Sequence, residues 1–201
     1  RVLEAVGTGR LNLSGPGLRQ AGDRPPLGLF IDNILAAEES EFSEKEALLD
    51  HVEAIVGSPF WERVMKAGQR FFEIPFAIRT DRSGLETGQA VAGPDIPVLL
   101  RGTIDLVFRE EAAGGREGGW VIADYKTDRV PVSAAALEST DWTLGVEQAR
   151  AVSPEFAAVV DRYVPQVRLY GRFWERITGE PVLEAGLYFT SIDRWVRLPG
   201  S

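Results

Sequence analysis

The chain has no cysteine, one histidine and one methionine among its 201 residues. Without cysteine it cannot form a disulfide framework, a zinc knuckle or a thiolate-held iron–sulfur cluster. It has no run of about eighteen apolar residues, so the sequence predicts no membrane span, and no secretory leader is expected. With 44% hydrophobic residues, the chain can still bury a proper core.

Lysine is also scarce: of the 22 Lys plus Arg residues, only Lys45, Lys66 and Lys126 are lysine. In so arginine-biased a sequence, a lysine beside carboxylates suggests a site that requires a compact ammonium. The formal net charge of −8 argues against a free-standing, high-affinity nucleic-acid binder, because phosphate contacts need clustered Lys and Arg. Carboxylates gathered at a metal site would add to this acidity until the cations bind.

Three charged side chains lie on two neighbouring segments that have the period-two pattern of strands. Asp105 lies in Val98–Phe108, and Asp124 and Lys126 lie in Trp120–Lys126. Alternate residues of a strand share a face, so Asp124 and Lys126 are expected on one face. Asp105 is expected on the face away from its apolar neighbours Ile104, Leu106 and Phe108.

A glycine-rich connector at residues 110–119 joins these two segments and is suited to an antiparallel hairpin. A hairpin that closes symmetrically between Gly114 and Gly115 places Asp105 opposite Asp124, about 5 Å away. Two like charges at that distance repel each other, and a divalent cation would relieve the repulsion. The simpler alternative is a surface hairpin that carries an ordinary Asp/Lys pair.

These residues resemble a known signature. Asp105 followed by Asp124-Tyr125-Lys126-Thr127 resembles the PD-(D/E)xK nuclease motif in the Gly-x-x-Asp … Asp-Tyr-Lys-Thr form of the RecB/AddA-like exonuclease domain, found in helicase–nuclease subunits. Three further segments match in the family's order: Phe72-Glu73-Ile-Pro75-Phe76, Tyr163-Val-Pro-Gln166-Val-Arg-Leu-Tyr170 and Leu187-Tyr-Phe-Thr-Ser191. The match is specific because four spaced elements agree over roughly residues 70 to 200.

The resemblance implies a catalytic centre that holds one or two Mg²⁺ (or Mn²⁺) ions. Asp105, Asp124 and the backbone carbonyl of Tyr125 would ligate the metal, since magnesium prefers hard oxygen ligands. Lys126 would orient the attacking water or stabilise the developing phosphorane. Asp128 lies close by in sequence and is expected to contact the loop instead.

Glu73, Gln166 and Tyr170 each have two interpretations. Glu73 interrupts an apolar strand, so its carboxylate needs a partner; that partner is a salt-bridged arginine or, as the resemblance implies, the nearby catalytic centre. Gln166 and Tyr170 are four residues apart and share a helix face. The resemblance implies that they face the metal and hold DNA; the alternative is a core-edge tyrosine with a solvated glutamine.

One part of the family's pattern is absent. The family carries a metal-binding histidine on an early helix, in a His-x-x-Leu-Glu-like setting, and this chain begins with Arg1-Val-Leu-Glu4, which resembles the residues just after it. The only histidine, His51, lies in a predicted helix and is expected to be a solvated or half-buried helix residue. We therefore expect the chain to be a fragment of a larger protein.

The order of predicted elements indicates an α/β fold: a restriction-endonuclease-like mixed central sheet flanked by helices, with an N-terminal helical part. The helical part is expected at residues 1–69 and the nuclease core at 70–201. Predicted helices cover Leu27–Ala37, Ser43 to about Val56, Ser58 to Ala67 and Ser153 to Thr178. Predicted strands cover Phe71–Ile78, Val98–Phe108, Trp120–Lys126, Val182–Thr190 and Arg194–Leu198. Loops are expected at Leu11–Pro26 and Asp81–Asp95.

The resemblance implies a metal-dependent deoxyribonuclease within an ATP-dependent helicase–nuclease that acts in double-strand break repair or recombination. The implied partners are single-stranded DNA or duplex ends, helicase domains of the same parent chain, which would use the ATP, and a second protein of the complex. No membrane partner is expected, and the implied location is cytoplasmic. A catalytically silent scaffold for a helicase is the main alternative. A glycosidase with paired carboxylates is weaker, because it leaves Lys126 and the Gln/Tyr helix unexplained.

Overall fold

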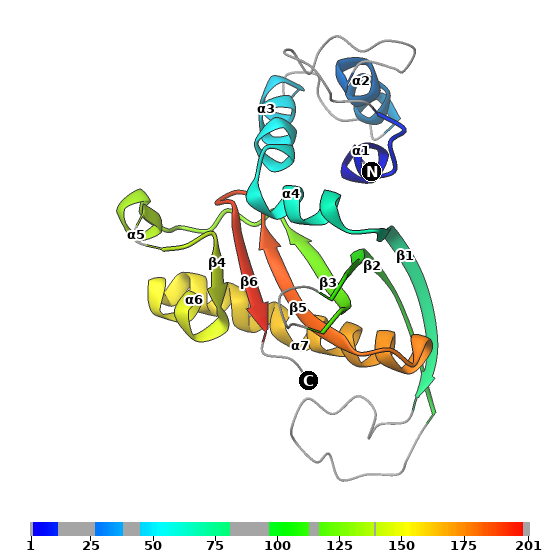
Figure 1. Cartoon of the computed structure of the whole chain (residues 1–201). Coiled ribbons are helices and arrows are strands. Elements are labelled where there is room, and N and C mark those ends of the chain that lie inside the picture. The colour runs from blue at the N-terminus through cyan, green and yellow to red at the C-terminus, as the bar shows by residue number, and fades with distance from the viewer. Residues whose placement is uncertain are drawn as a thin grey trace. The chain divides into compact units, whose positions relative to one another are not determined.

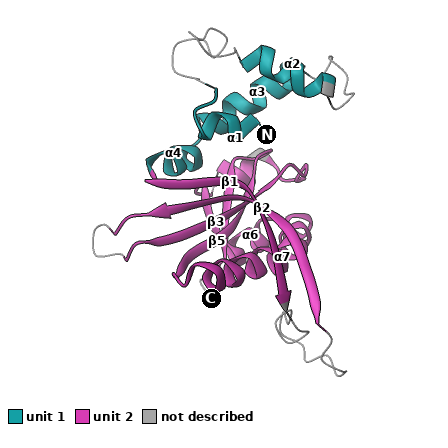
Figure 2. Cartoon of the chain, turned by 90° about the vertical axis from the view of Figure 1, so that its right-hand side faces the viewer, with its two compact units in different colours: residues 1–66 teal, residues 67–201 magenta. Residues whose placement is uncertain are grey.

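The computed structural model describes residues 2–11, 27–37, 45–80, 97–112, 117–138 and 140–198. The chain divides into two compact units, residues 1–66 and 67–201 (Figure 2). No helix in the described ranges is long and apolar enough to cross a membrane. Four predicted features fall wholly or largely outside these ranges: the loops at Leu11–Pro26 and Asp81–Asp95, the helix-opening Ser43 and the turn between Gly114 and Gly115.

The first unit is helical, as the sequence predicts. Its helices are α1 (Val2–Gly7), α2 (Leu27–Ala37), α3 (Lys45–Val56) and α4 (Pro59–Lys66). Helix α4 begins at the predicted place, where the Ser58 hydroxyl accepts a hydrogen bond from the Trp61 backbone N–H at 3.1 Å. Pro59 occupies the first helical position, where no N–H is needed. His51 is half-buried on α3.

The second unit is built on a six-stranded mixed sheet with the order β1-β2-β3-β5-β6-β4 (Figure 1). The strands are β1 (Gln69–Thr80), β2 (Val98–Glu110), β3 (Gly119–Lys126), β4 (Thr143–Gly145), β5 (Val182–Phe189) and β6 (Arg194–Leu198). Strand β3 pairs in parallel with β5, and β4 in parallel with β6, while the other neighbours are antiparallel. The predicted mixed α/β sheet flanked by helices is confirmed, and it is consistent with a restriction-endonuclease-like fold.

The long helix α7 (Pro154–Thr178) lies along one face of this sheet (Figure 1). It begins and ends as predicted: the Ser153 hydroxyl accepts from the Phe156 N–H, and Gly179 ends the helix with φ 71°. Its apolar side joins the core of the unit, which includes Val160, Val164, Val167, Ile122, Leu187 and Phe189. The short elements α5 (Ala134–Glu138), β4 and α6 (Val146–Val152) were not predicted from the sequence.

Candidate metal centre

The pairing of β2 with β3 brings two aspartates together. The ladder runs from Glu110 opposite Gly119 to Leu106 opposite Ala123. Extended by one residue, the same register puts Asp105 across from Asp124, as the symmetric hairpin predicts. The Tyr125 backbone N–H donates to Asp105 Oδ2 at 2.7 Å, which fixes the Asp105 carboxylate beside β3.

The alternation of side chains along strand β1 is interrupted close to the two aspartates. Phe71 lies 6.5 Å from Trp174 of α7, and Phe76 lies 5.5 Å from Tyr170 of the same helix, measured between ring centroids. Residues five apart point to opposite faces of a regular strand, so the alternation shifts between Phe71 and Phe76. Glu73 lies between them with φ 51°, a left-handed conformation that strains a non-glycine residue. We assign the shift to Glu73.

The neighbouring strand β2 shows the same shift. Ile104 and Val107 both belong to the core cluster that contains Ile122, although residues three apart face opposite ways in a regular strand. The prediction that Asp105 lies on the face away from Ile104 assumed uninterrupted alternation along β2, and this assumption is wrong between Ile104 and Val107. The shift lies between Ile104 and Val107, where β2 pairs with the irregular part of β1.

Glu73 is exposed, which corrects the prediction of a mid-strand carboxylate in need of a partner. Its place in the register is opposite Asp105, because Phe72 pairs with Leu106 and Ile74 with Ile104. Among the described residues no arginine or lysine forms an ion pair with it, so the salt-bridge alternative fails for this part of the chain. Its charge contributes to raising the pKa of Asp105.

The two aspartates differ in burial, and the pKa of each is raised. Asp124 is 3% exposed, and this burial raises its pKa, against the opposing effect of the Lys126 ammonium. Burial, followed by the Asp124 charge, raises the pKa of Asp105 to about 6, against the opposing Tyr125 N–H. The Lys126 Nζ forms an ion pair with Asp124 Oδ2 at 2.5 Å, and no other donor of the described residues reaches this oxygen.

Helix α7 brings two predicted side chains to the lysine. Lys126 Nζ donates to Gln166 Oε1 at 3.5 Å, and Gln166 Nε2 donates to the Tyr170 hydroxyl at 2.6 Å. Gln166 is therefore not simply solvated, and Tyr170 is buried at 6% exposure. The structure places both side chains beside the acidic pair, one helical turn apart.

A glycine on β2 makes room for this arrangement. Gly102 pairs with Phe76 across the strands, and a Cβ atom at Gly102 would lie 2.8 Å from the Phe76 ring. The ring therefore needs glycine at this position in order to lie over β2 and meet Tyr170 edge-on. The predicted Gly-x-x-Asp and Glu-x-Pro-Phe segments thus support each other through a direct contact.

Tyr163 was missed as a site residue by the sequence analysis. Its ring centroid lies 3.8 Å from Lys126 Nζ, and its hydroxyl donates to the Asp128 carboxylate at 3.2 and 3.3 Å. The Asp128 side chain thus contacts α7, whereas a loop contact was expected; only its backbone carbonyl meets the turn, through Ser191. The available signal was position: Tyr163 precedes Gln166 by one helical turn, within the same motif.

The donor set of the acidic pair fits a hard divalent cation. Both aspartates offer carboxylate oxygens, and Asp124 Oδ2 is buried with no donor of the described residues other than the Lys126 ammonium. Within the described ranges no group of three or more His, Cys, Asp or Glu side chains is placed to hold a metal ion. Two carboxylates still suit magnesium, which usually keeps several waters and shares substrate phosphate oxygens.

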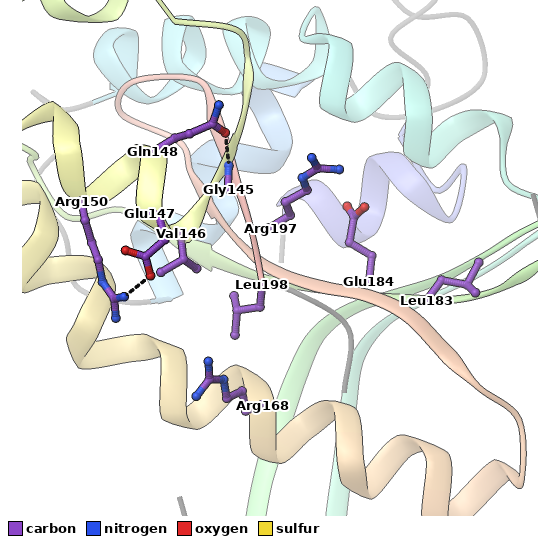
Figure 3. A pocket seen from close by; sticks show the side chains of 10 residues that line it. All are labelled: Gly145, Val146, Glu147, Gln148, Arg150, Arg168, Leu183, Glu184, Arg197 and Leu198. Atoms are coloured by element: carbon purple, nitrogen blue, oxygen red, sulfur yellow. Dashed lines mark hydrogen bonds and ion pairs between the residues drawn. The ribbon is translucent and has the colours of Figure 1, made fainter. Parts of the chain in front are cut away.

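A hollow of about 420 Å³ lies on the same unit, away from the acidic pair (Figure 3). Its lining comes from α6, α7, β4, β5 and β6 and comprises Gly145, Val146, Glu147, Gln148, Arg150, Arg168, Leu183, Glu184, Arg197 and Leu198. Arg150 is engaged by Glu147 and by Asp161. The lining of the hollow includes neither Asp105 nor Asp124.

The raised pKa of Asp105 predicts an unusual pH dependence of stability in the metal-free chain. The pKa rises from 3.8 to about 6 on folding, so between these values the folded state holds a proton that the unfolded state has lost. Stability from this group therefore increases as the pH falls from 7 to about 4. Asp105→Asn should stabilise the metal-free chain at pH 7 by about 1–2 kcal/mol, and by less at pH 5.

Urea unfolding in the presence of a chelator, at pH 7 and pH 5, measures this difference. Asp141→Asn is the matched control, because Asp141 is an exposed carboxylate of the same unit and its replacement should change stability little. An Asp105→Asn variant that is less stable than the parent at pH 7 would contradict the electrostatic account of the pair.

The chain is similar to the A subunits of known helicase/nucleases. The chain is 28% identical over 190 residues to the A subunit of the ATP-dependent helicase/nuclease of Carboxydothermus hydrogenoformans, covering 93% of this chain and 13% of that protein. It is 29% identical over 165 residues to the corresponding protein of Heliobacterium modesticaldum (82% and 10% covered) and 31% over 169 residues to that of Alkaliphilus oremlandii (82% and 11% covered). No protein-family model matches the chain. The chain thus spans roughly a tenth of the length of these relatives, and its predicted resemblance to the AddA-like helicase–nucleases is confirmed.

Proposed function

Because this chain is a homologue of the A subunit of ATP-dependent helicase/nucleases, we propose that its second unit is a metal-dependent deoxyribonuclease centre. The observation that carries the proposal is the β2–β3 register, which, continued one residue beyond the end of the ladder, sets Asp105 against Asp124. Lys126 lies 2.5 Å from Asp124 on the same strand. Paired carboxylates beside a lone ammonium supply the groups that phosphodiester hydrolysis requires.

Asp105 and Asp124 would hold Mg²⁺ or Mn²⁺, with the backbone carbonyl of Tyr125 as a third protein oxygen. The bound ion would lower the pKa of a water molecule and neutralise charge on the scissile phosphate. Glu73, exposed opposite Asp105, would orient solvent at the open side of the pair. The strained backbone of Glu73 is the kind of feature that clusters at functional sites.

The remaining groups act on the substrate. Lys126 would hold a phosphate oxygen or orient the attacking water through its ammonium group. Gln166 would position that ammonium, since its side-chain oxygen faces Nζ and its amide nitrogen is held by Tyr170. Gln166 and Tyr170 together would contact the DNA strand from the α7 side.

The wider assignment follows from the relatives' names. We infer that the parent protein degrades single-stranded DNA or duplex ends during double-strand break repair or recombination. Helicase domains, driven by ATP, would deliver the strand, and a second subunit would complete the assembly. Delivery by attached domains is compatible with a chain of net charge −8, because such a nuclease need not grip DNA by itself.

A catalytically silent scaffold is the second candidate function. One observation favours it: within the described ranges no third acidic or histidine side chain completes a metal cluster. Such a module would keep the fold in order to support a helicase or guide a strand. It would have no defined cation site.

Isothermal calorimetry with Mn²⁺ separates these two candidates. A nuclease centre should give saturable binding at one or two sites per chain, and at 100 times Kd the ion should stabilise the fold by about 2.7 kcal/mol. Asp141→Ala, which removes an exposed carboxylate of the same unit, should bind as the parent does. A chain that is fully folded but shows no saturable Mn²⁺ binding would leave the scaffold as the better description.

A further inference from the structure

We propose that Tyr163 and Gln166 form an alternative binding position, the second seat, for the Lys126 ammonium. The ammonium occupies this position when a cation binds to Asp124 in its place. Tyr163 is then a positioning residue that acts on the reaction through Lys126. This inference rests on the proposed function, because it requires Asp124 to bind the metal.

The ammonium is contacted by three groups from two elements. Asp124 Oδ2 lies 2.5 Å from Nζ on β3. On α7, the Tyr163 ring centroid lies 3.8 Å and Gln166 Oε1 lies 3.5 Å from the same atom. The Lys126 side chain is only 12% exposed, so protein groups replace most of its hydration.

A metal ion and the ammonium cannot both occupy the same position beside one carboxylate oxygen. Asp124 Oδ2 receives no other donor from the described residues, and it is the oxygen that Lys126 approaches. A divalent cation there would repel the ammonium and displace it. A buried ammonium that loses its carboxylate is costly unless other groups compensate its charge.

Tyr163 and Gln166 provide this compensation. The face of an aromatic ring attracts an ammonium, and the attraction strengthens where water is excluded. The Gln166 amide is oriented with its oxygen towards Nζ, because its nitrogen donates to the Tyr170 hydroxyl at 2.6 Å. The ammonium can therefore move from Asp124 to the α7 side without entering an apolar environment.

Hydrogen bonds hold both the Tyr163 ring and the backbone of Lys126 in place. The Tyr163 hydroxyl donates to Asp128, and the Asp128 carbonyl accepts from the Ser191 hydroxyl at 2.7 Å. The Lys126 carbonyl accepts from the Thr190 N–H at 2.9 Å and from the Thr190 hydroxyl at 3.2 Å. The backbone of Lys126 and the ring of Tyr163 are thus both held, and the proposed change of position involves only the lysine side chain.

The experiment measures Mn²⁺ affinity by calorimetry in the 201-residue chain and its variants. Tyr163→Leu removes the ring and should weaken Mn²⁺ binding about tenfold, because the displaced ammonium loses its alternative seat. Tyr163→Phe keeps the ring and should stay close to the parent. In a Lys126→Met background, Tyr163→Leu should have no effect on affinity, because no ammonium remains to be seated.

A second readout follows the ammonium directly. During a Mg²⁺ titration, the ring current of residue 163 should change the chemical shifts of the Lys126 ε-methylene protons. We expect this change in the parent and in Tyr163→Phe. Tyr163→Leu should show no such change. Circular dichroism confirms that each variant is folded before it is titrated.

Two results would overturn the proposal while leaving the metal site intact. One is an equal loss of Mn²⁺ affinity from Tyr163→Leu with and without Lys126, which would mark Tyr163 as merely structural. The other is a Tyr163→Phe variant as impaired as Tyr163→Leu. A folded parent chain that binds no Mn²⁺ would overturn the proposed function itself, and this inference with it.

Discussion

Replacing Asp124 by alanine should abolish Mn²⁺ binding at the acidic pair and reduce DNA cleavage by at least about a thousandfold, the scale typical of removing a preorganised electrostatic group. Asp124 is the residue on which the site converges: it lies opposite Asp105 in the register and 2.5 Å from the Lys126 ammonium. Its carboxylate is buried, at 3% exposure. Its loss removes a ligand and leaves the ammonium without its anion.

Asp124→Asn is the companion variant, because it preserves the shape of the side chain while removing the charge. Calorimetry with Mn²⁺ and cleavage of a labelled single-stranded oligonucleotide measure the two effects, with circular dichroism to confirm folding. Exposed Asp141→Ala should match the parent in both assays. Folded Asp124 variants that bind and cut as well as the parent, after contaminating nuclease is removed, would end the assignment.

Local periodicity was enough to predict most of the second unit. The aspartates were matched correctly because an antiparallel hairpin that closes symmetrically fixes every pair along its length. Helix α7 was bounded correctly because Ser153, Pro154 and Gly179 each carry a local terminus signal. These features depend on residues close together in the sequence.

The features that were missed depend on tertiary structure. Nothing in the neighbouring sequence requires Glu73 to adopt φ 51°; its conformation becomes visible only where Phe71 and Phe76 both meet α7. Strand β4 has three residues, too few to show a period, and is recognised by its pairing with β6. The contact of Tyr163 with Lys126 joins residues far apart in the chain, so spacing alone could not reveal it.

Replacing Lys126 by methionine should separate metal binding from catalysis. The ammonium occupies the Asp124 oxygen that the cation needs, so its removal should tighten Mn²⁺ binding about tenfold, the effect of a difference of about 1.4 kcal/mol. The same change should lower cleavage at saturating metal by roughly 10²–10⁴-fold, because residues 67–201 contain no other lysine and no histidine to orient the water or the phosphate. Methionine retains the length of the buried stem.

These opposite signs distinguish Lys126 from a residue that only maintains the structure. A structural lysine would weaken metal binding and cleavage together when replaced, because the acidic pair would lose its geometry. Lys66→Met is the matched control: Lys66 is exposed at the end of α4 in the first unit and pairs only with Glu62 among the described residues. Cleavage that persists in Lys126→Met at parental rates would remove the lysine from the mechanism, and Mn²⁺ affinity that falls with it would contradict the competition between ammonium and cation at Asp124.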